Sequence, residues 1–231
     1  MIDLHLTLKS AHIVSGMAAV LLGPLPLLSR KGSWTHRMSG RLFVLAGAVA
    51  LSCAALAVLL YPHPVPLMAA TLLTAYQFIG GLRALPRFGA RLGLFDAGLA
   101  LSAAGLGALL VPIMSRGSAS WPPAVGWTML GWLTMVVTYD LSRHLWAATW
   151  RHGWRPLDHG LKLTGAYFGM ASAGAGNGLH ALQPWSQLAP SVLGTLVMAL
   201  LAVNYVRRRR LVRSAAVPLP VPPHDPDTAL G

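Results

Sequence analysis

The sequence predicts an all-α membrane protein, a polytopic bundle of about seven transmembrane helices, and three observations support this fold class. Hydrophobic residues make up 55% of the 231 residues and charged residues only 10%, whereas about 25% is usual in soluble domains. The apolar residues form runs long enough to cross about 30 Å of hydrocarbon as helices. The basic residues lie in short clusters between these runs.

Each predicted span contains about 18–22 residues, the length that a membrane helix needs. The seven spans are 9–28, 42–61, 65–82, 92–113, 125–146, 161–180 and 188–206. The third opens with Pro64 and Pro66, so its boundary is poorly defined, and the fifth becomes polar after Tyr139. Residues 1–206 therefore form one predicted membrane domain. Residues 207–231 are basic and then Pro-rich, which predicts a disordered cytoplasmic tail close to anionic headgroups.

The basic clusters also predict an orientation. Sixteen of the 18 lysines and arginines lie in segments that share one face of a seven-span topology, and only Lys9 and Arg116 lie on the other face. The positive-inside rule then places the amino terminus outside and the carboxyl terminus inside. The predicted location is a cell membrane, the bacterial inner membrane, with the lipid bilayer and its anionic headgroups as partners. The net charge of +12 could suggest nucleic acid, but that function requires a basic patch on a soluble fold.

Several familiar signatures do not occur in the sequence. The first residues lack the basic region of a cleaved signal peptide. Cys53 is the single cysteine and lies within a predicted span, so neither a disulfide framework nor a thiolate metal cluster is expected. We find no G-x-S-x-G, H-E-x-x-H or Walker motif. Whether the protein is an enzyme is left open.

Ionisable residues within membrane spans are costly and often functional, and here they fall into two groups by depth. The candidate inner polar site contains His36, Arg37, Asp96, Asp140, His144, His159 and Lys162, and the candidate outer site contains His12, Asn177 and His180. Within the inner group, Asp140 and His144 are four residues apart and therefore share a helix face. The span 161–180 also carries Gly165-x-x-x-Gly169, which predicts close packing at the centre of the bundle.

Three hypotheses follow for the function. The first is a structural or accessory membrane protein, in which the polar residues pair with one another or cap helices. The second is a haem- or metal-binding redox protein, because His36, His144 and His159 lie near one face while His12 and His180 lie near the other. The third is a small-solute or proton carrier that uses Asp96, Asp140 and Arg83. The nearly apolar stretch between the two polar groups weakens this third hypothesis.

The stretch HIVSGMAAVLLGPLPLLSRKGSWTHRMSGRLF (12–43) resembles the opening of a family of bacterial multi-pass membrane proteins of unknown function. That family reads roughly H-I-x-x-G-x-x-A-x-x-x-G, then K-G, then H-R-x-x-G-x-x-[YF]. Further matching positions are Tyr76, Gly81, Arg83, Asp96, Asp140, His159, Lys162, Gly165, Tyr167 and Asn177. The resemblance implies a polytopic membrane protein and no particular activity. The resemblance favours His36 and Arg37, opposite His159, as the inner site. Family members often have arginine where Lys162 stands, a change that keeps the charge but alters the hydrogen-bonding geometry.

Overall fold

The structure is a computed structural model that describes residues 3–62, 65–85, 92–115 and 123–215. All regular secondary structure in these ranges is helical. The seven long helices are α1 (Leu4–Leu22), α3 (Trp34–Leu60), α4 (Val65–Arg83), α5 (Leu94–Ser115), α6 (Pro123–Ser142), α8 (Arg155–Gly178) and α9 (Trp185–Ala215), and the short ones include α2 (Pro24–Leu28) and α7 (Ala147–Thr149). The predicted all-α class is confirmed for the described residues.

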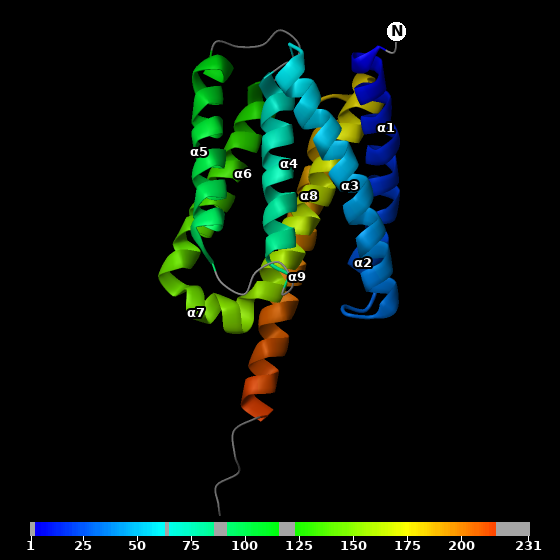
Figure 1. The fold of residues 1–231 in the computed structure, drawn as a ribbon. Helices are drawn as coiled ribbons and strands as arrows, with labels where there is room; N and C mark the ends of the chain where they lie inside the picture. The colour runs from blue at the N-terminus through cyan, green and yellow to red at the C-terminus, as the bar shows by residue number, and fades with distance from the viewer. Residues whose placement is uncertain (1–2, 63–64, 86–91, 116–122, 216–231) are drawn as a thin grey trace, which may run out of the picture.

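The long helices run alternately up and down (Figure 1). The α2–α3 turn, the carboxyl end of α4, the connection through α7 and the carboxyl end of α9 therefore lie at the same end of the bundle. We call this the basic end. Its basic residues include Arg30, Lys31, Arg37, Arg83, Arg151 and Arg207. The helix directions thus gather in space the basic clusters that are separate in the sequence.

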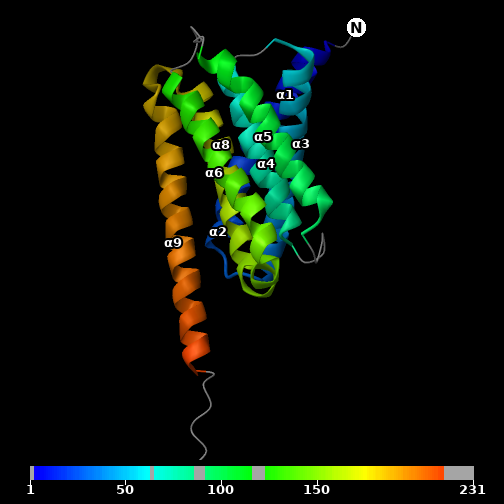
Figure 2. The same ribbon diagram turned by 90° about the vertical axis from the view of Figure 1, so that its left-hand side faces the viewer.

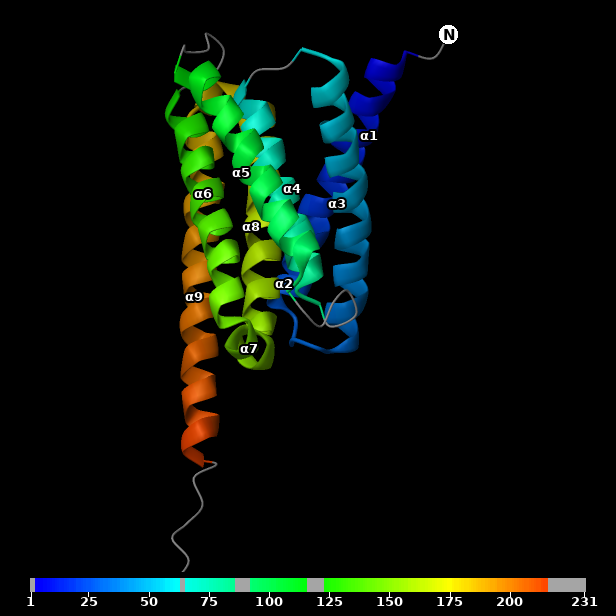
Figure 3. The ribbon, with the colours of Figure 1, turned by 60° about the vertical axis from the view of Figure 1, so that its left-hand side comes forward.

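Helix α8 occupies the centre of the bundle and packs against α1, α4 and α9. Figures 2 and 3 show α9 on one side of α8, where it extends beyond the other helices at the basic end. One buried apolar cluster joins α4, α5 and α6 around Tyr76, Leu110 and Leu133. A second joins α1, α3, α4 and α8 around Phe43 and Phe78. The predicted central position of this glycine-rich helix is confirmed.

Glycines allow α8 to approach its neighbours closely. A Cβ on Gly169 would lie 2.7 Å from Thr74 Oγ1 of α4, and a Cβ on Gly194 of α9 would lie 2.6 Å from Phe168 Cβ of α8. Both distances are too short for real contacts. Small residues at such positions permit the packing that holds helices together in a membrane.

The outer surface of the bundle is strongly apolar. Leu28 of α2, Leu59 of α3 and Leu94 of α5 are 84%, 80% and 93% exposed. Soluble proteins rarely expose continuous apolar surfaces of this kind. Four helical stretches among the described residues are long and apolar enough to cross a membrane, Leu4–Leu28, Trp34–Leu60, Leu94–Ser115 and Trp185–Leu211. Together these features indicate a membrane protein.

Several helices extend beyond the predicted spans. Helix α3 begins at Trp34, where the Ser33 side chain accepts a hydrogen bond from His36 N, although the predicted span begins at 42. Helix α9 continues through its four consecutive arginines to Ala215, past the predicted boundary at 206. Hydropathy marks where a helix meets lipid, whereas arginine and lysine continue a helix readily in water. The remainder of the predicted tail, 216–231, lies outside the described residues.

Candidate functional site

Four charged side chains form one buried cluster near the basic end, which we call the charge cluster. Asp140 lies on α6, Arg143 begins the 3₁₀ turn Arg143–Trp146 that follows it, and Asp158 and Lys162 lie on α8. They are 3%, 5%, 2% and 4% exposed respectively. Two carboxylates and two cations make the formal charge of the cluster zero.

Each cation bridges both carboxylates. Lys162 Nζ lies 2.6 Å from Asp140 Oδ1 and 3.1 Å from Asp158 Oδ1. Arg143 Nη2 lies 2.9 Å from Asp140 Oδ1, and Arg143 Nη1 lies 2.5 Å from Asp158 Oδ2. The four groups therefore form a closed network of ion pairs.

Two neutral donors complete the network. Tyr76 of α4 donates its hydroxyl hydrogen to Asp140 Oδ2 at 2.6 Å, and Trp150 Nε1–H donates to Asp158 Oδ2 at 3.1 Å. All four carboxylate oxygens thus have a donor. Arg143 Cζ also lies 4.9 Å from the centre of the Trp150 ring, within the range of a cation–π contact. The network connects α4, α6 and α8.

Local sequence spacing brings the charges together. Asp140 and Arg143 are three residues apart, and Asp158 and Lys162 are four apart, so each pair occupies one side of its own turn or helix. The chain between them turns back through α7 and a π-helical turn, Trp150–Trp154. This return places α8 beside the end of α6, and Trp150 reaches the charge cluster from within the connection.

The charge cluster is suited to holding helices together. Moving separate charges out of water is costly, and a buried charge is tolerated only when its partners and hydrogen bonds compensate for this cost. Both carboxylates here are saturated with donors, whereas Arg143 Nε has no hydrogen-bond partner. The arrangement therefore provides no unpaired carboxylate that could serve as a base.

Asp96, another predicted inner residue, belongs to a separate ion pair between α4 and α5. Arg83 Nη2 lies 2.9 Å from Asp96 Oδ2, and Arg83 Nε donates to Asp96 Oδ1 at 3.1 Å. Asp96 also accepts a hydrogen bond from Gly93 N. The two-point contact fits the geometry of a guanidinium and a carboxylate.

His36 and Arg37, the most distinctive residues of the opening motif, stabilise the α2–α3 turn. His36 Nδ1 lies 2.9 Å from Pro26 O, and Arg37 Nη1 donates to Gly32 O at 2.7 Å. Lys31 Nζ donates to Pro26 O and to Leu27 O at the end of α2, and desolvation there lowers the pKa of this ammonium. The turn also needs Gly32, whose φ is +80°.

His159 and His144 occupy different environments. His159 is half-buried, and its Nδ1 lies 2.9 Å from Gly81 O of α4. His144 is exposed on the 3₁₀ turn. The structure does not bring His144 into the charge cluster, because α6 ends at Ser142 and Arg143 occupies the position beside Asp140.

The three predicted outer residues occupy different positions in the bundle. His12 Nδ1 lies 2.9 Å from Ala50 O and connects α1 to α3. Asn177 Nδ2 donates to Ala173 O within α8, and His180 is exposed in the turn before α9. Among the described residues, no group of three or more metal-ligating side chains gathers in one place.

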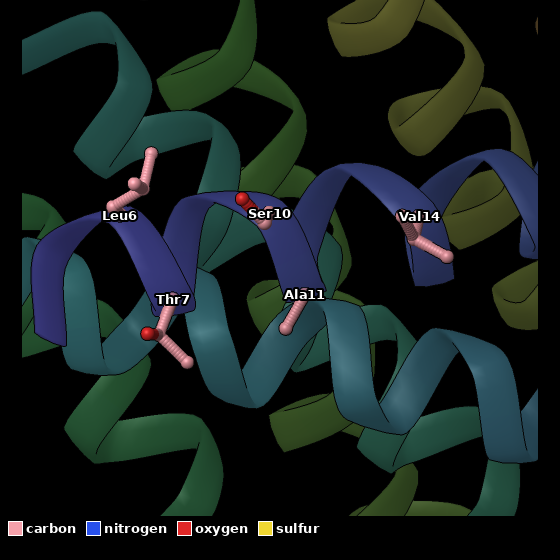
Figure 4. Close-up of a pocket in the computed structure, with 5 residues that line it drawn as sticks. All are labelled: Leu6, Thr7, Ser10, Ala11 and Val14. Atoms are coloured by element: carbon pink, nitrogen blue, oxygen red, sulfur yellow. The ribbon is translucent and has the colours of Figure 1, made fainter. Parts of the chain in front are cut away.

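Two open depressions on the described surface include no residue of the charge cluster. The first is open and is lined by five side chains of α1 alone, Leu6, Thr7, Ser10, Ala11 and Val14 (Figure 4). The second follows α4 along Phe78, Ile79, Leu82 and Arg83. Both are surface features of single helices.

Sequence reasoning placed Asp140 and Lys162 in the inner site but left Arg143, Asp158, Tyr76 and Trp150 outside it. The signal for the first two was present, because spacings of three and four residues connect Arg143 to Asp140 and Lys162 to Asp158. A buried carboxylate also requires a counter-charge. Tyr76 and Trp150 carry no comparable local signal, since their partners are distant in the sequence or belong to an irregular turn.

No protein-family model, curated protein or solved structure matches this chain. The helices and the ion pairs by themselves place the protein in a broad class, the all-α membrane proteins with a buried charge cluster. The family resemblance of the opening motif stays a prediction.

Proposed function

We propose that this chain is a seven-span integral protein of the bacterial inner membrane, with its amino terminus outside, its carboxyl terminus in the cytoplasm and a structural or accessory role. Seven helices of 19 to 31 residues support the number of spans. The basic residues that lie together at the carboxyl end of α9 support the orientation.

One observation carries the structural role. The most deeply buried charges satisfy one another, and the bonds that do so connect α4, α6 and α8. A transport or catalytic site needs at least one group that is free to bind a ligand or a proton, and the carboxylates of the charge cluster are occupied. Buried ion networks of this kind can fix which helices pack together.

Labelling of single cysteines tests the proposed orientation. In a Cys53→Ser background, Ala181→Cys and Thr149→Cys form a matched pair, because both residues are small and exposed. Thr149 precedes α8 and Ala181 follows it, so the two residues lie beyond opposite ends of this helix. We expect a membrane-impermeant maleimide to label Ala181→Cys in intact cells. It should label Thr149→Cys only after the membrane is permeabilised. The reverse pattern would contradict the orientation, and labelling of both in intact cells would contradict the span between them.

A second candidate function, haem or metal binding, is supported by the imidazole hydrogen bonds. His12, His36 and His159 each place Nδ1 near a backbone carbonyl. This contact commonly fixes a ligating histidine and leaves Nε2 for the metal. His36 of α3 and His159 of α8 come from different helices near the basic end (Figure 1), so they are the pair of candidate ligands that this hypothesis takes.

A visible spectrum of the detergent-purified protein tests the haem hypothesis. If His36 and His159 bind haem, we expect a Soret band that shifts on reduction with dithionite and is lost in His159→Ala. The matched control is His152→Ala, because His152 is exposed in the α7 connection. A spectrum without a Soret band in protein purified from haem-supplemented cells would rule out this hypothesis and favour the structural role.

A further inference from the structure

We propose that the basic end carries a binding site for the headgroup phosphate of an anionic phospholipid, formed where α9 passes the connection between α6 and α8. Its components are Gly153, Trp154, Tyr205 and Arg209, which we call the Trp154 shelf. This inference rests on the proposed function, because it requires the basic end to face a membrane leaflet.

The charge balance of the basic end supports an external anion. The three described carboxylates of this end, Asp96, Asp140 and Asp158, are each already paired with buried or half-buried cations. Additional arginines carry charge beyond these pairs, namely Arg30, Arg37, Arg41, Arg151, Arg207, Arg208 and Arg209. Anionic leaflet lipids attract such charge at about 1 kcal/mol per basic residue.

At the Trp154 shelf, aromatic packing holds an arginine that has no carboxylate partner among the described residues. Tyr205 of α9 donates its hydroxyl hydrogen to Gly153 O at 2.5 Å, and its ring centre lies 6.3 Å from that of Trp154. Arg209, one turn further along α9, places Cζ 5.2 Å from the centre of the Trp154 ring. A Cβ on Gly153 would meet the Arg209 guanidinium, so glycine allows this close approach.

The charge of Arg209 is not neutralised by a carboxylate of the described residues. Its Nη1 is covered and has no hydrogen-bond acceptor within the described ranges. Arginine is the side chain that proteins favour for binding phosphate groups. The exposed Arg151 lies in the same connection, and the exposed Arg207 and Arg208 precede Arg209 on α9. Figure 3 shows that α9 extends beyond the other helices at this end.

The depth of the shelf is that of a membrane interface. Trp154 precedes the predicted span 161–180, and Arg209 follows the predicted span 188–206. Tryptophan favours the headgroup level of a bilayer. Trp154 and Arg209 thus combine an interfacial aromatic ring with an uncompensated cation, which fits the phosphate and glycerol region of an anionic lipid.

Native mass spectrometry of the full chain in detergent, titrated with phosphatidylglycerol or phosphatidylcholine, tests the proposal. We expect phosphatidylglycerol to bind the unaltered protein and Arg209→Gln to weaken its binding about fivefold. Arg41→Gln, which removes an exposed arginine on α3, is the matched control and should weaken binding less than twofold. Arg209→Lys keeps the charge, loses the planar fork and should give an intermediate value. It also serves as the second variant if Arg209→Gln does not fold.

Two results would overturn the proposal. Equal weakening by Arg209→Gln and Arg41→Gln would indicate diffuse attraction to the whole basic end without a site. Inorganic phosphate that bound as strongly as phosphatidylglycerol at the same concentration would indicate a general anion site in place of a lipid site. Because binding in detergent is independent of orientation, failure of the lipid site and failure of the orientation in cysteine labelling are separate outcomes.

Discussion

Replacing Asp140 by asparagine should lower the free energy of unfolding by about 3–5 kcal/mol, because it leaves a buried cation without its partner. Lys162 and Arg143 would then share the single carboxylate of Asp158. Tyr76 would still find an oxygen in the new amide, so the loss comes mainly from the uncompensated charge. Reversible unfolding by sodium dodecyl sulfate in mixed micelles, followed by tryptophan fluorescence, measures this change.

The double variant Asp140→Asn with Lys162→Met should recover most of that loss. It restores a neutral cluster in which Arg143 still pairs with Asp158 at 2.5 Å. Replacing a buried ion pair by apolar groups of similar volume is often neutral or even stabilising. The double variant should therefore be more stable than Asp140→Asn alone, and a double-mutant cycle gives the coupling energy directly.

Asp3→Asn is the control for loss of one negative charge at an exposed position. Asp3 caps α1 by accepting a hydrogen bond from His5 N, and asparagine caps helices about as well as aspartate. We expect a change below about 0.5 kcal/mol. A double variant as unstable as the sum of its single changes would show that Asp140 and Lys162 do not act as a pair, which would contradict the structural role of the charge cluster.

The sequence was sufficient to predict the fold class and half of the charge cluster. Composition and run length predict an all-α membrane protein without any knowledge of packing. Asp140 and Lys162 are recognisable because a charge inside an apolar run is expensive. The other half depends on the connection between α6 and α8, whose 3₁₀ and π-helical turns rotate Arg143 and Trp150 inward. An α-helical spacing continued through this connection favours His144 instead, and His144 is exposed.

The histidines show a different limit of sequence reasoning. The residue types suggested ligands or ion pairs, yet His12, His36 and His159 each contact a backbone carbonyl of another segment. Such contacts depend on where a neighbouring helix ends or bends, as at Pro26 before the α2–α3 turn. No pattern of side chains along the sequence records the position of a carbonyl on another helix.

Glycine content predicted close packing of α8 but not its partners. Gly165 and Gly169 face Gln77 and Thr74 of α4, which are polar residues in an apolar run. One close approach to α9 depends on Gly194, which the sequence analysis did not single out, since an isolated glycine in a span gives only a weak signal. Which glycines contact a neighbour depends on helix rotation, and helix rotation depends on the whole bundle.

Gly194→Ala should lower the free energy of unfolding by about 2 kcal/mol, because overpacking in a well-packed core costs 1–3 kcal/mol. The added Cβ would lie 2.6 Å from Phe168 Cβ. A change of rotamer cannot move a Cβ, so the backbones of α8 and α9 must separate. Alanine is otherwise the better helix former by up to about 1 kcal/mol. A measured loss would therefore understate the cost of the collision.

Gly174→Ala is the matched control, since it makes the same change in α8 where nothing lies within 4 Å of the added Cβ. We expect it to be neutral or to stabilise the protein in the same unfolding experiment. Equal effects of the two substitutions would mean that α8 and α9 do not pack as closely as the structure has them. If Gly194→Ala alone destabilises the protein, the α8–α9 contact contributes to stability independently of the charge cluster, because its residues share no partner with Asp140 or Lys162.

Separation of α9 from α8 would also move Arg209 away from Trp154, so Gly194→Ala should weaken phosphatidylglycerol binding although it changes no charge.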